Sequence, residues 1–193
     1  MTLAGQKILY LVSEDWYFCS HRLPIARAAR DAGAEVVVAT RVQDKRSIIE
    51  AEGFRLIQIE LSRSGRNPFH DAATLNSLIN LYRRERPDIV HHVALKPALY
   101  GSIASWLTGI PSMINAFAGM GFLFISEGLF ARAVRPIVRV AFRFLLNRPT
   151  SRVIVQNPDD FALFTNTIGI SPERITIIKG SGVDIEQYQP APE

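Results

Sequence analysis

The chain has 193 residues, 48% of them hydrophobic, and a formal net charge of +4 at pH 7, so we expect a single domain and an anionic partner that charge alone does not identify. Cys19 is the only cysteine, which excludes an intramolecular disulfide and suits a reducing cytosol. No apolar run reaches the roughly 20 residues that a membrane-spanning helix needs, so we expect a chain that is soluble or lies on a membrane surface.

Short apolar runs with β character alternate with helical segments along the chain. The first predicted strand spans residues 8–12, and a helix follows that Ser20 caps and Gly33 ends. The further predicted strands are residues 36–39, 54–59, 88–92, 112–116, 152–156 and 175–178. The further predicted helices are residues 46–51, 69–86, 97–107, 132–147 and 158–167. This alternation predicts an α/β fold with a doubly wound parallel sheet that is Rossmann-like.

The last predicted strand is followed by Gly180, Ser181 and Gly182, and then by Tyr188 and Pro190. A glycine-rich exit from a strand with a proline further on is typical of punctuation between domains. We therefore assign residues 1–180 to one domain and expect residues 181–193 to begin an interdomain linker.

Polar and aromatic side chains gather after the first strand, at the edge where parallel sheets bind ligands. Residues 13–20 include Glu14, Asp15 and Trp16 but no glycine, which argues strongly against the Gly-x-Gly-x-x-Gly loop of an ordinary dinucleotide-dependent oxidoreductase. Carboxylates beside an aromatic ring suit contact with a sugar. The next pair, His21 and Arg22, either contributes to an anion site at the start of the following helix or only solvates that helix end.

Two further groups are candidates for a binding site. Because adjacent residues on a strand point to opposite faces, His91 and His92 do not easily hold one ion, and we expect no metal. One of them, with Lys96, lines a pocket in one interpretation and is a hydrogen-bonded core histidine in the other. Gly119 and Gly121 either let the backbone approach a ligand closely or belong to an ordinary flexible loop.

Five stretches resemble, in the expected order, the first domain of family 4 glycosyltransferases. They read SEDWYFCSHRLPIARAARDAGAEVVVAT, PDIVHHVALKPALYGSIAS, INAFAGMGFLF, RVIVQNPDDFALF and ITIIKGSGVD. The resemblance implies the N-terminal half of the B-type fold, in which two Rossmann-like domains face each other across a cleft. It also implies a retaining enzyme that moves a sugar from a nucleotide-sugar donor onto a lipid-linked oligosaccharide or a polysaccharide precursor, without cofactor or metal. Because the donor is held mainly by the second domain, we expect this half alone to be inactive.

In this resemblance the first domain binds the acceptor. Many relatives carry a histidine after the fifth strand, whereas residues 114–117 here contain Asn115, so no catalytic residue is assigned. The residues that we expect to bind the acceptor are Glu14, Asp15, Trp16, His21, Arg22, His91, His92, Lys96, Asn115, Gly119 and Gly121. The alternative function is a non-catalytic, membrane-recruiting subunit of a split glycosyltransferase.

The predicted helix at 132–147 is strongly basic. Within an arc of roughly 80° it places four arginines, Arg132, Arg135, Arg139 and Arg143. The opposite apolar stripe fits either a helix on anionic lipid or a helix that covers the sheet, and the absence of interleaved acids favours lipid. We therefore expect a cytoplasmic protein, peripheral on the inner face of the cytoplasmic membrane. Its expected partners are a nucleotide-sugar donor, a lipid-linked or saccharide acceptor and the anionic membrane surface, and not nucleic acid.

Overall fold

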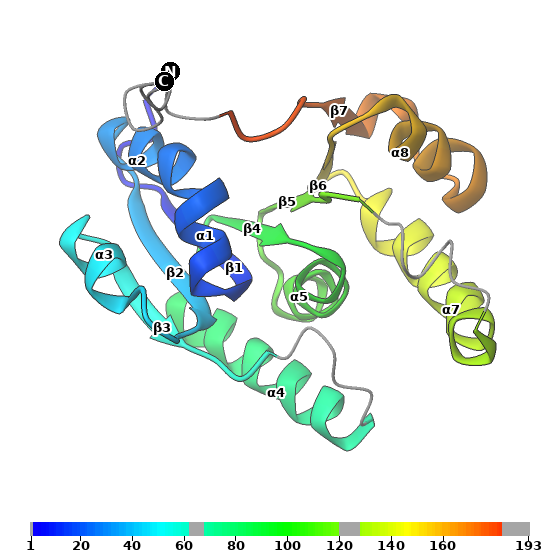
Figure 1. The fold of residues 1–193 in the computed structure, drawn as a ribbon, viewed down its shortest axis with the longest axis horizontal. Coiled ribbons are helices and arrows are strands. Elements are labelled where there is room, and N and C mark those ends of the chain that lie inside the picture. Colours follow the sequence, from blue (N-terminus) through cyan, green and yellow to red (C-terminus); the bar gives the residue numbers. More distant parts are fainter. Residues whose placement is uncertain (1, 62–67, 120–127, 183–193) are drawn as a thin grey trace, which may run out of the picture.

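The structure of the protein is a computed structural model that describes residues 2–61, 68–119 and 128–182 (Figure 1). It contains a seven-stranded sheet in the order β3-β2-β1-β4-β5-β6-β7, in which all neighbouring strands are parallel. The strands are β1 (Lys7–Glu14), β2 (Glu35–Arg41), β3 (Arg55–Gln58), β4 (Ile89–Val93), β5 (Ser112–Ala116), β6 (Ser151–Val155) and β7 (Ile175–Ile177). The predicted α/β fold with a Rossmann-like parallel sheet is thus confirmed.

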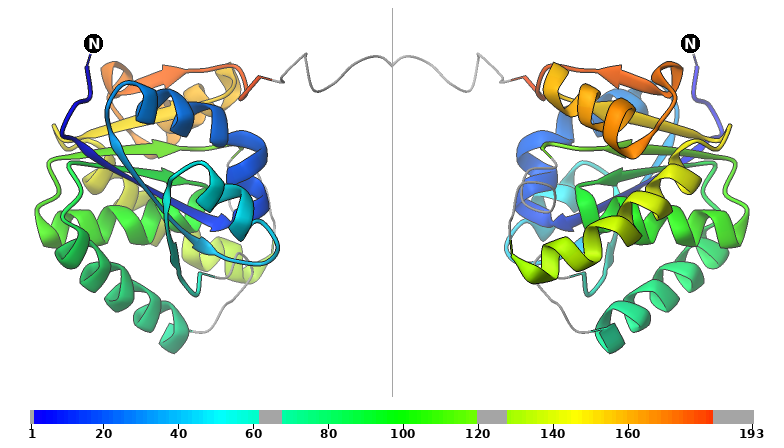
Figure 2. Two further views of the ribbon diagram at one scale, coloured as in Figure 1. Left: turned by 90° about the vertical axis from the view of Figure 1, so that its left-hand side faces the viewer. Right: turned by 90° about the vertical axis from the view of Figure 1, so that its right-hand side faces the viewer.

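Helices cover both faces of this sheet (Figure 2). The helices are α1 (Asp15–His21), α2 (Leu23–Asp31), α3 (Arg46–Ala51), α4 (Pro68–Glu85), α5 (Leu95–Thr108), α7 (Leu129–Leu146) and α8 (Pro158–Ala162). A π-helical segment (Leu163–Ile168) and a 3-10 turn (Pro172–Arg174) follow α8. The core beneath α1, α2 and α3 is separate from the cores beneath α4, α5 and α7, so the sheet is wound on both sides.

The central strand β1 shows why the apolar runs become strands. Tyr10 and Val12 pack into the core beneath α1 and α2, whereas Leu9 and Leu11 pack into the core on the other face. A strand that is buried on both faces needs apolar residues at consecutive positions. Each such buried side chain contributes about 1.5–3 kcal/mol relative to an exposed one.

The first helical region differs from the prediction. Strand β1 runs on to Glu14 and α1 begins at Asp15, so residues 13–20 are a strand end and a helix rather than a loop. Ser20 does not cap a helix, because it lies within α1 and its hydroxyl donates to the Trp16 carbonyl at 2.9 Å. The helical path breaks at Arg22, since Pro24 has no N–H to continue the hydrogen bonds of α1 and is tolerated only in the first turn of a new helix.

A buried polar chain joins β4 and β5 to the helices α4 and α5. His92 is fully buried, with Nε2 3.0 Å from the Tyr82 hydroxyl and Nδ1 2.8 Å from the Asn115 amide oxygen. The Ser102 hydroxyl donates to the same amide oxygen at 3.0 Å. Burial lowers the pKa of His92 to about 4, so the ring is neutral at pH 7 and fits a donor Nδ1 and an acceptor Nε2.

We expect Gly101→Ala to destabilise the fold, although alanine normally stabilises a helix interior by about 1 kcal/mol relative to glycine. A Cβ at Gly101 would lie 2.5 Å from the His92 ring. The ring would have to leave its hydrogen bonds, and we expect the free energy of unfolding to fall by about 1–3 kcal/mol in urea titrations. Leu107→Ala, at an exposed position of the same helix, is the control and should change it by less than about 0.5 kcal/mol. A more stable Gly101→Ala variant would contradict the packing described.

Candidate functional site

The candidate site lies where β1 and β4 end. The chain leaves β1 towards β2 but leaves β4 towards β5, so the strand order reverses between these two neighbours. In open parallel sheets ligands bind outside the carboxyl ends of the strands at such a switch point. Glu14 ends β1 at this edge, Asp15 follows it, and Ala94 follows β4.

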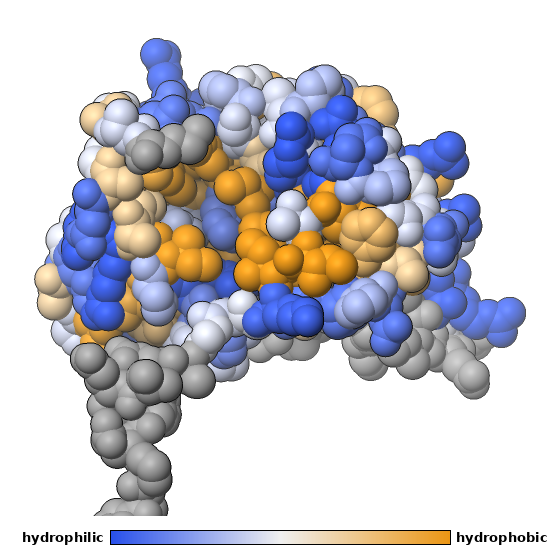
Figure 3. Space-filling view, turned by 90° about the horizontal axis from the view of Figure 1, so that it is seen from above, coloured by the Kyte–Doolittle hydropathy of each residue, from blue (hydrophilic) through white to orange (hydrophobic). Residues whose placement is uncertain are grey.

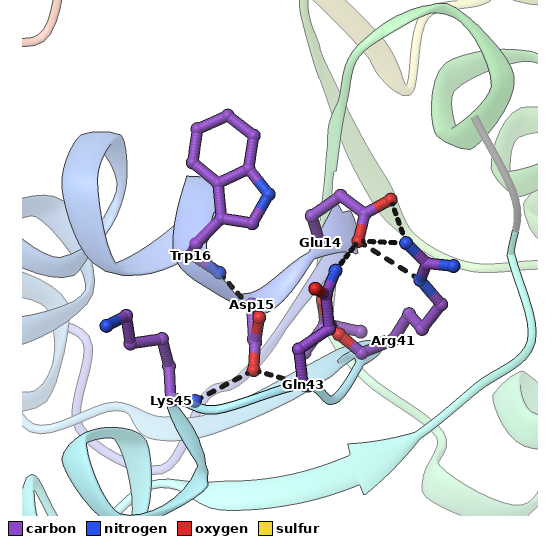
Figure 4. Close-up of polar contacts among 7 residues, drawn as sticks. Glu14, Asp15, Trp16, Arg41, Gln43 and Lys45 are labelled. Atoms are coloured by element: carbon purple, nitrogen blue, oxygen red, sulfur yellow. Dashed lines mark hydrogen bonds and ion pairs between the residues drawn. The ribbon is translucent and has the colours of Figure 1, made fainter. Parts of the chain in front are cut away.

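Glu14 is held by side chains that follow β2 (Figure 4). The Arg41 guanidinium donates from Nε at 3.1 Å and from a terminal nitrogen at 2.9 Å, and the Gln43 amide donates at 2.6 Å. Glu14 is buried, so these three bonds occupy a carboxylate that has little contact with water. The sequence pattern did not indicate Arg41 or Gln43 as partners of Glu14. Only their position at and just after the end of β2, the strand next to β1, points to such a contact.

Asp15 is fully buried and accepts hydrogen bonds from three backbone N–H groups (Figure 4). These belong to Trp16 at 2.7 Å, Gln43 at 2.7 Å and Lys45 at 2.9 Å. Burial raises the pKa of this carboxyl, but the backbone donors outweigh burial and hold the pKa below its usual 3.8. Glu14 and Asp15 thus have hydrogen-bond partners within the chain and hold the start of α1 to the segment at the end of β2.

The outer surface of α1 is aromatic. Trp16 is 41% exposed, and its ring meets that of Tyr17 edge-on with centroids 5.6 Å apart. Tyr17 stacks on His21 at 4.3 Å, and His21 Nδ1 lies 2.6 Å from the Ser20 hydroxyl. His21 therefore belongs to the last turn of α1 and not to the start of a helix, which corrects its predicted place.

The start of α5 is strained and has no side-chain cap. Ala94 has φ 81° and ψ 171°, a backbone conformation that costs a residue other than glycine about 1–3 kcal/mol. Its N–H donates to the Ala116 carbonyl at 3.0 Å, which joins the ends of β4 and β5. The first turn of α5 therefore begins at the switch point without a side-chain cap, and Lys96 there lies 3.4 Å from an Asp71 carboxylate oxygen. Nothing in the sequence pointed to Ala94, because alanine has no preference for this conformation.

The predicted site residues fall into separate places. His91 and His92 do point to opposite faces, as predicted. His92 and Asn115 lie in the buried hydrogen-bonded network that joins β4 and β5 to α4 and α5. Gly119 is exposed with φ 92°, while Gly121 lies outside the described residues.

Arg22 and His91 lie on the face of the sheet that α1 and α2 cover. Arg22 is buried at the junction of these two helices, and His91 stacks on Tyr10 with centroids 5.1 Å apart. Within residues 2–61, 68–119 and 128–182, no three His, Cys, Asp or Glu side chains are grouped as metal ligands would be. In the same ranges no helix is long and apolar enough to cross a membrane.

The chain is thus a doubly wound α/β domain with an exposed aromatic ring and an uncapped helix start at its switch point. Residues 7–157 match the family described as glycosyl transferase 4-like. Because this match covers most of the chain, the protein belongs to that family, and the resemblance found in the sequence is confirmed.

Two bacterial enzymes and one solved structure are similar to the chain. N,N'-diacetylbacillosaminyl-diphospho-undecaprenol alpha-1,3-N-acetylgalactosaminyltransferase of Campylobacter jejuni is 24% identical over 169 residues, which are 88% of this chain and 44% of that enzyme. UDP-Gal:alpha-D-GlcNAc-diphosphoundecaprenol alpha-1,3-galactosyltransferase of Escherichia coli is 28% identical over 124 residues, which are 63% and 30% of the two chains. The structure of Anabaena HepE, solved in complex with UDP and glucose, is similar to this chain with a TM-score of 0.65 and 17% sequence identity. The match covers 97% of this chain and 47% of HepE. The chain thus spans less than half the length of these three proteins.

We expect Asp15→Asn to lower the free energy of unfolding by about 1–3 kcal/mol at pH 7, because the charge that three N–H groups share is lost. The folded pKa of Asp15 lies below its usual 3.8, so this stabilisation is present above pH 3.8 and is lost as the pH falls through the folded pKa. Urea titrations from pH 7 downward should therefore show the two proteins converging in acid.

The control for this prediction is Asp44→Asn, in the same segment. The Asp44 side chain is 71% exposed, so the change should leave stability nearly unaltered at every pH. A gap between wild type and Asp15→Asn that stays constant down to the lowest pH would show that the carboxylate charge is not what holds the segment.

Proposed function

We propose that the chain is the acceptor-binding half of a retaining glycosyltransferase that moves a sugar from a nucleotide-sugar onto a lipid-linked oligosaccharide or polysaccharide precursor. The observation that carries this proposal is membership of the glycosyl transferase 4-like family, because the two curated relatives are both named as transferases that act on a sugar diphospho-undecaprenol. The retaining outcome follows from the family resemblance. We assign donor binding to the part of the relatives that this chain does not span.

The residues at the switch point suit an acceptor that carries both a sugar and a diphosphate. The exposed face of Trp16 offers an apolar surface to the carbon-bound hydrogens of a sugar ring. The first turn of α5 and the Lys96 ammonium favour negative charge, which a diphosphate supplies. Glu14 and Asp15 hold α1 and the segment after β2 in place, so Trp16 is presented on a fixed support.

The chemistry needs groups from both halves. Cations in the donor half stabilise the diphosphate that leaves the sugar, and this half orients the attacking hydroxyl of the acceptor. We therefore propose that the chain binds acceptor but does not turn over by itself.

Trp16 and Trp106 provide a test variant and a matched control, which distinguish the loss of sugar binding from the general loss of an exposed aromatic ring. They are 41% and 44% exposed, on α1 and near the end of α5. Trp16→Ala should weaken the binding of a soluble geranyl-diphospho-N-acetylglucosamine about 2- to 10-fold in calorimetry, because stacking is lost. Trp106→Ala should leave this affinity unchanged, and neither protein should bind a UDP-sugar tightly.

Tight UDP-sugar binding without acceptor binding would make the chain a donor-binding module instead. A chain that binds neither ligand but still binds vesicles would favour the alternative, a membrane-recruiting subunit of a split enzyme.

We also propose that α7 lies on the membrane surface at the inner face of the cytoplasmic membrane. One side of the helix is buried in the core through Val138, Phe142 and Leu145. A second apolar stripe faces outward, since Ile137 and Val140 are 69% and 68% exposed. The sequence pattern predicted a single apolar stripe opposite the arginines and did not separate the buried apolar residues from the exposed ones.

The outward stripe has basic and aromatic neighbours. Arg132, Arg139 and Arg143 are exposed next to it along α7. Phe144 meets Trp106 of α5 edge-on at 5.3 Å, and the Arg148 guanidinium lies 5.7 Å from the Phe144 ring. Exposed apolar groups beside cations are the composition of an interfacial helix on anionic lipid. Arg135 is half-buried and therefore contributes less to this surface.

Charge reversal of Arg132, Arg139 and Arg143 to Glu should lower binding to anionic vesicles at least about 100-fold at low salt, since each basic residue near the surface contributes about 1 kcal/mol. Reversal of three exposed arginines outside α7, Arg46, Arg83 and Arg152, is the control and should have a much smaller effect. Ile137→Ser with Val140→Ser should weaken binding at low and high salt alike, because apolar burial is not screened. Co-sedimentation measures all three variants, and equal losses for the two arginine sets would contradict a membrane role for α7.

A further inference from the structure

Arg22 is a buried cation without an anionic partner. Its side chain is only 6% exposed, and its Nε has no hydrogen-bond partner. A terminal guanidinium nitrogen donates to the His21 carbonyl at 3.2 Å and to the Ser181 hydroxyl at 3.1 Å. No carboxylate forms an ion pair with Arg22 among the residues that the structure describes. An uncompensated buried charge is costly, and burial accordingly lowers the pKa of this guanidinium.

His91 brings a second unpaired group to the same place. It is 5% exposed, and its Nε2 also has no hydrogen-bond partner within the described part of the chain. Burial, together with the charge of Arg22 and the neighbouring His92, lowers the pKa of His91 to about 3. The ring is therefore neutral at pH 7 and has an N–H to donate.

We propose that Arg22 and His91 form a binding site for a phosphate group on the face of the sheet that α1 and α2 cover. A phosphate supplies the negative charge that Arg22 lacks and the acceptor oxygens that the planar guanidinium and an imidazole N–H need. Seen from above, the molecule is hollowed between hydrophobic side chains (Figure 3).

Ser181 occupies part of the place that the phosphate would take. Its hydroxyl is the one side-chain acceptor on Arg22 in the described structure, and it lies between Gly180 and Gly182, with φ 74° and 73°. Positive φ at both glycines gives this segment conformations that other residues rarely adopt. A bound phosphate would replace the Ser181 hydroxyl as the partner of Arg22.

The first experiment uses the chain with inorganic pyrophosphate as probe, in a chloride buffer of constant ionic strength. Calorimetry should show saturable binding that Arg22→Gln weakens about 10-fold or more, because a charged hydrogen-bond partner is lost. Arg46→Gln, which removes an exposed arginine, is the control and should bind as the wild type does. Arg22→Lys should lie between the two, since it keeps the charge but loses the planar fork.

A second readout follows His91 itself. Its pKa, measured by NMR, should rise from about 3 by roughly one to three units when pyrophosphate binds, because a negative charge then lies beside the ring. A merely structural Arg22 would not produce this change. Pyrophosphate binding that is equal in wild type and Arg22→Gln, or a His91 pKa that ignores the ligand, would overturn the proposal.

Ser181→Asp keeps the test decisive if Arg22→Gln fails to fold. The new carboxylate should pair with Arg22, raise the pKa of His91 without ligand and weaken pyrophosphate binding about 10-fold or more. Ser181→Ala should leave that binding intact. Pyrophosphate binding that persists in Ser181→Asp, or succinate binding as tight as that of pyrophosphate, would overturn the assignment.

Two further probes, UDP and geranyl diphosphate, test with the same variants which kind of ligand carries the phosphate group. Tighter binding of UDP than of pyrophosphate, lost in Arg22→Gln, would assign the site to a nucleotide. Tighter binding of geranyl diphosphate, lost in the same variant, would assign it to a prenyl diphosphate. Neither result depends on the proposed acceptor role of Trp16, so failure of this site and failure of the proposed function are distinguishable.

Discussion

The carboxylate of Asp15 is the group on which the arrangement of the carboxyl edge depends. It is fully buried, and three backbone N–H groups from two separate segments converge on it. A buried charge is costly without such partners, so these hydrogen bonds hold together the start of α1 and the segment after β2. Glu14 and Arg41 add an ion pair beside it. With its neighbours anchored inside, Trp16 is left as the exposed group of this edge.

The other side of the switch point is held by packing rather than by charge. Ala94 adopts a strained conformation between β4 and α5, and such strain persists only where the surroundings over-determine it. Those surroundings include the neutral His92 ring, which joins Tyr82 of α4 to Asn115 of β5, and Gly101 of α5, which leaves room for that ring. The position of the uncapped start of α5 is therefore a consequence of the core behind it.

The carboxyl edge of the sheet and the helix α7 form two surfaces with different properties. The carboxyl edge combines a fixed aromatic ring with an uncapped helix start, which suits a polar ligand with a sugar and negative charge. The helix α7 buries one apolar stripe and exposes another beside arginines, which suits an anionic interface. The proposed binding of a lipid-linked acceptor depends on both surfaces, and they lie on different helices that cover the same sheet.

The sequence by itself determined the parallel sheet, because a strand buried on both faces must be apolar at consecutive positions; residues 112–116 were predicted and observed with the same bounds. It also predicted the end of α5 to within one residue, at Leu107 against the observed Thr108, and Gly109 behind it has the φ of 71° that a left-handed helix end requires. Only the tertiary structure decided which polar residues are supports and which face outward. Asp15 meets partners about thirty positions away, and Arg22 meets Ser181 across most of the chain, so no local pattern reveals them. The polar groups of a site are placed by such distant contacts, whereas strands and helix ends follow from the properties of neighbouring residues.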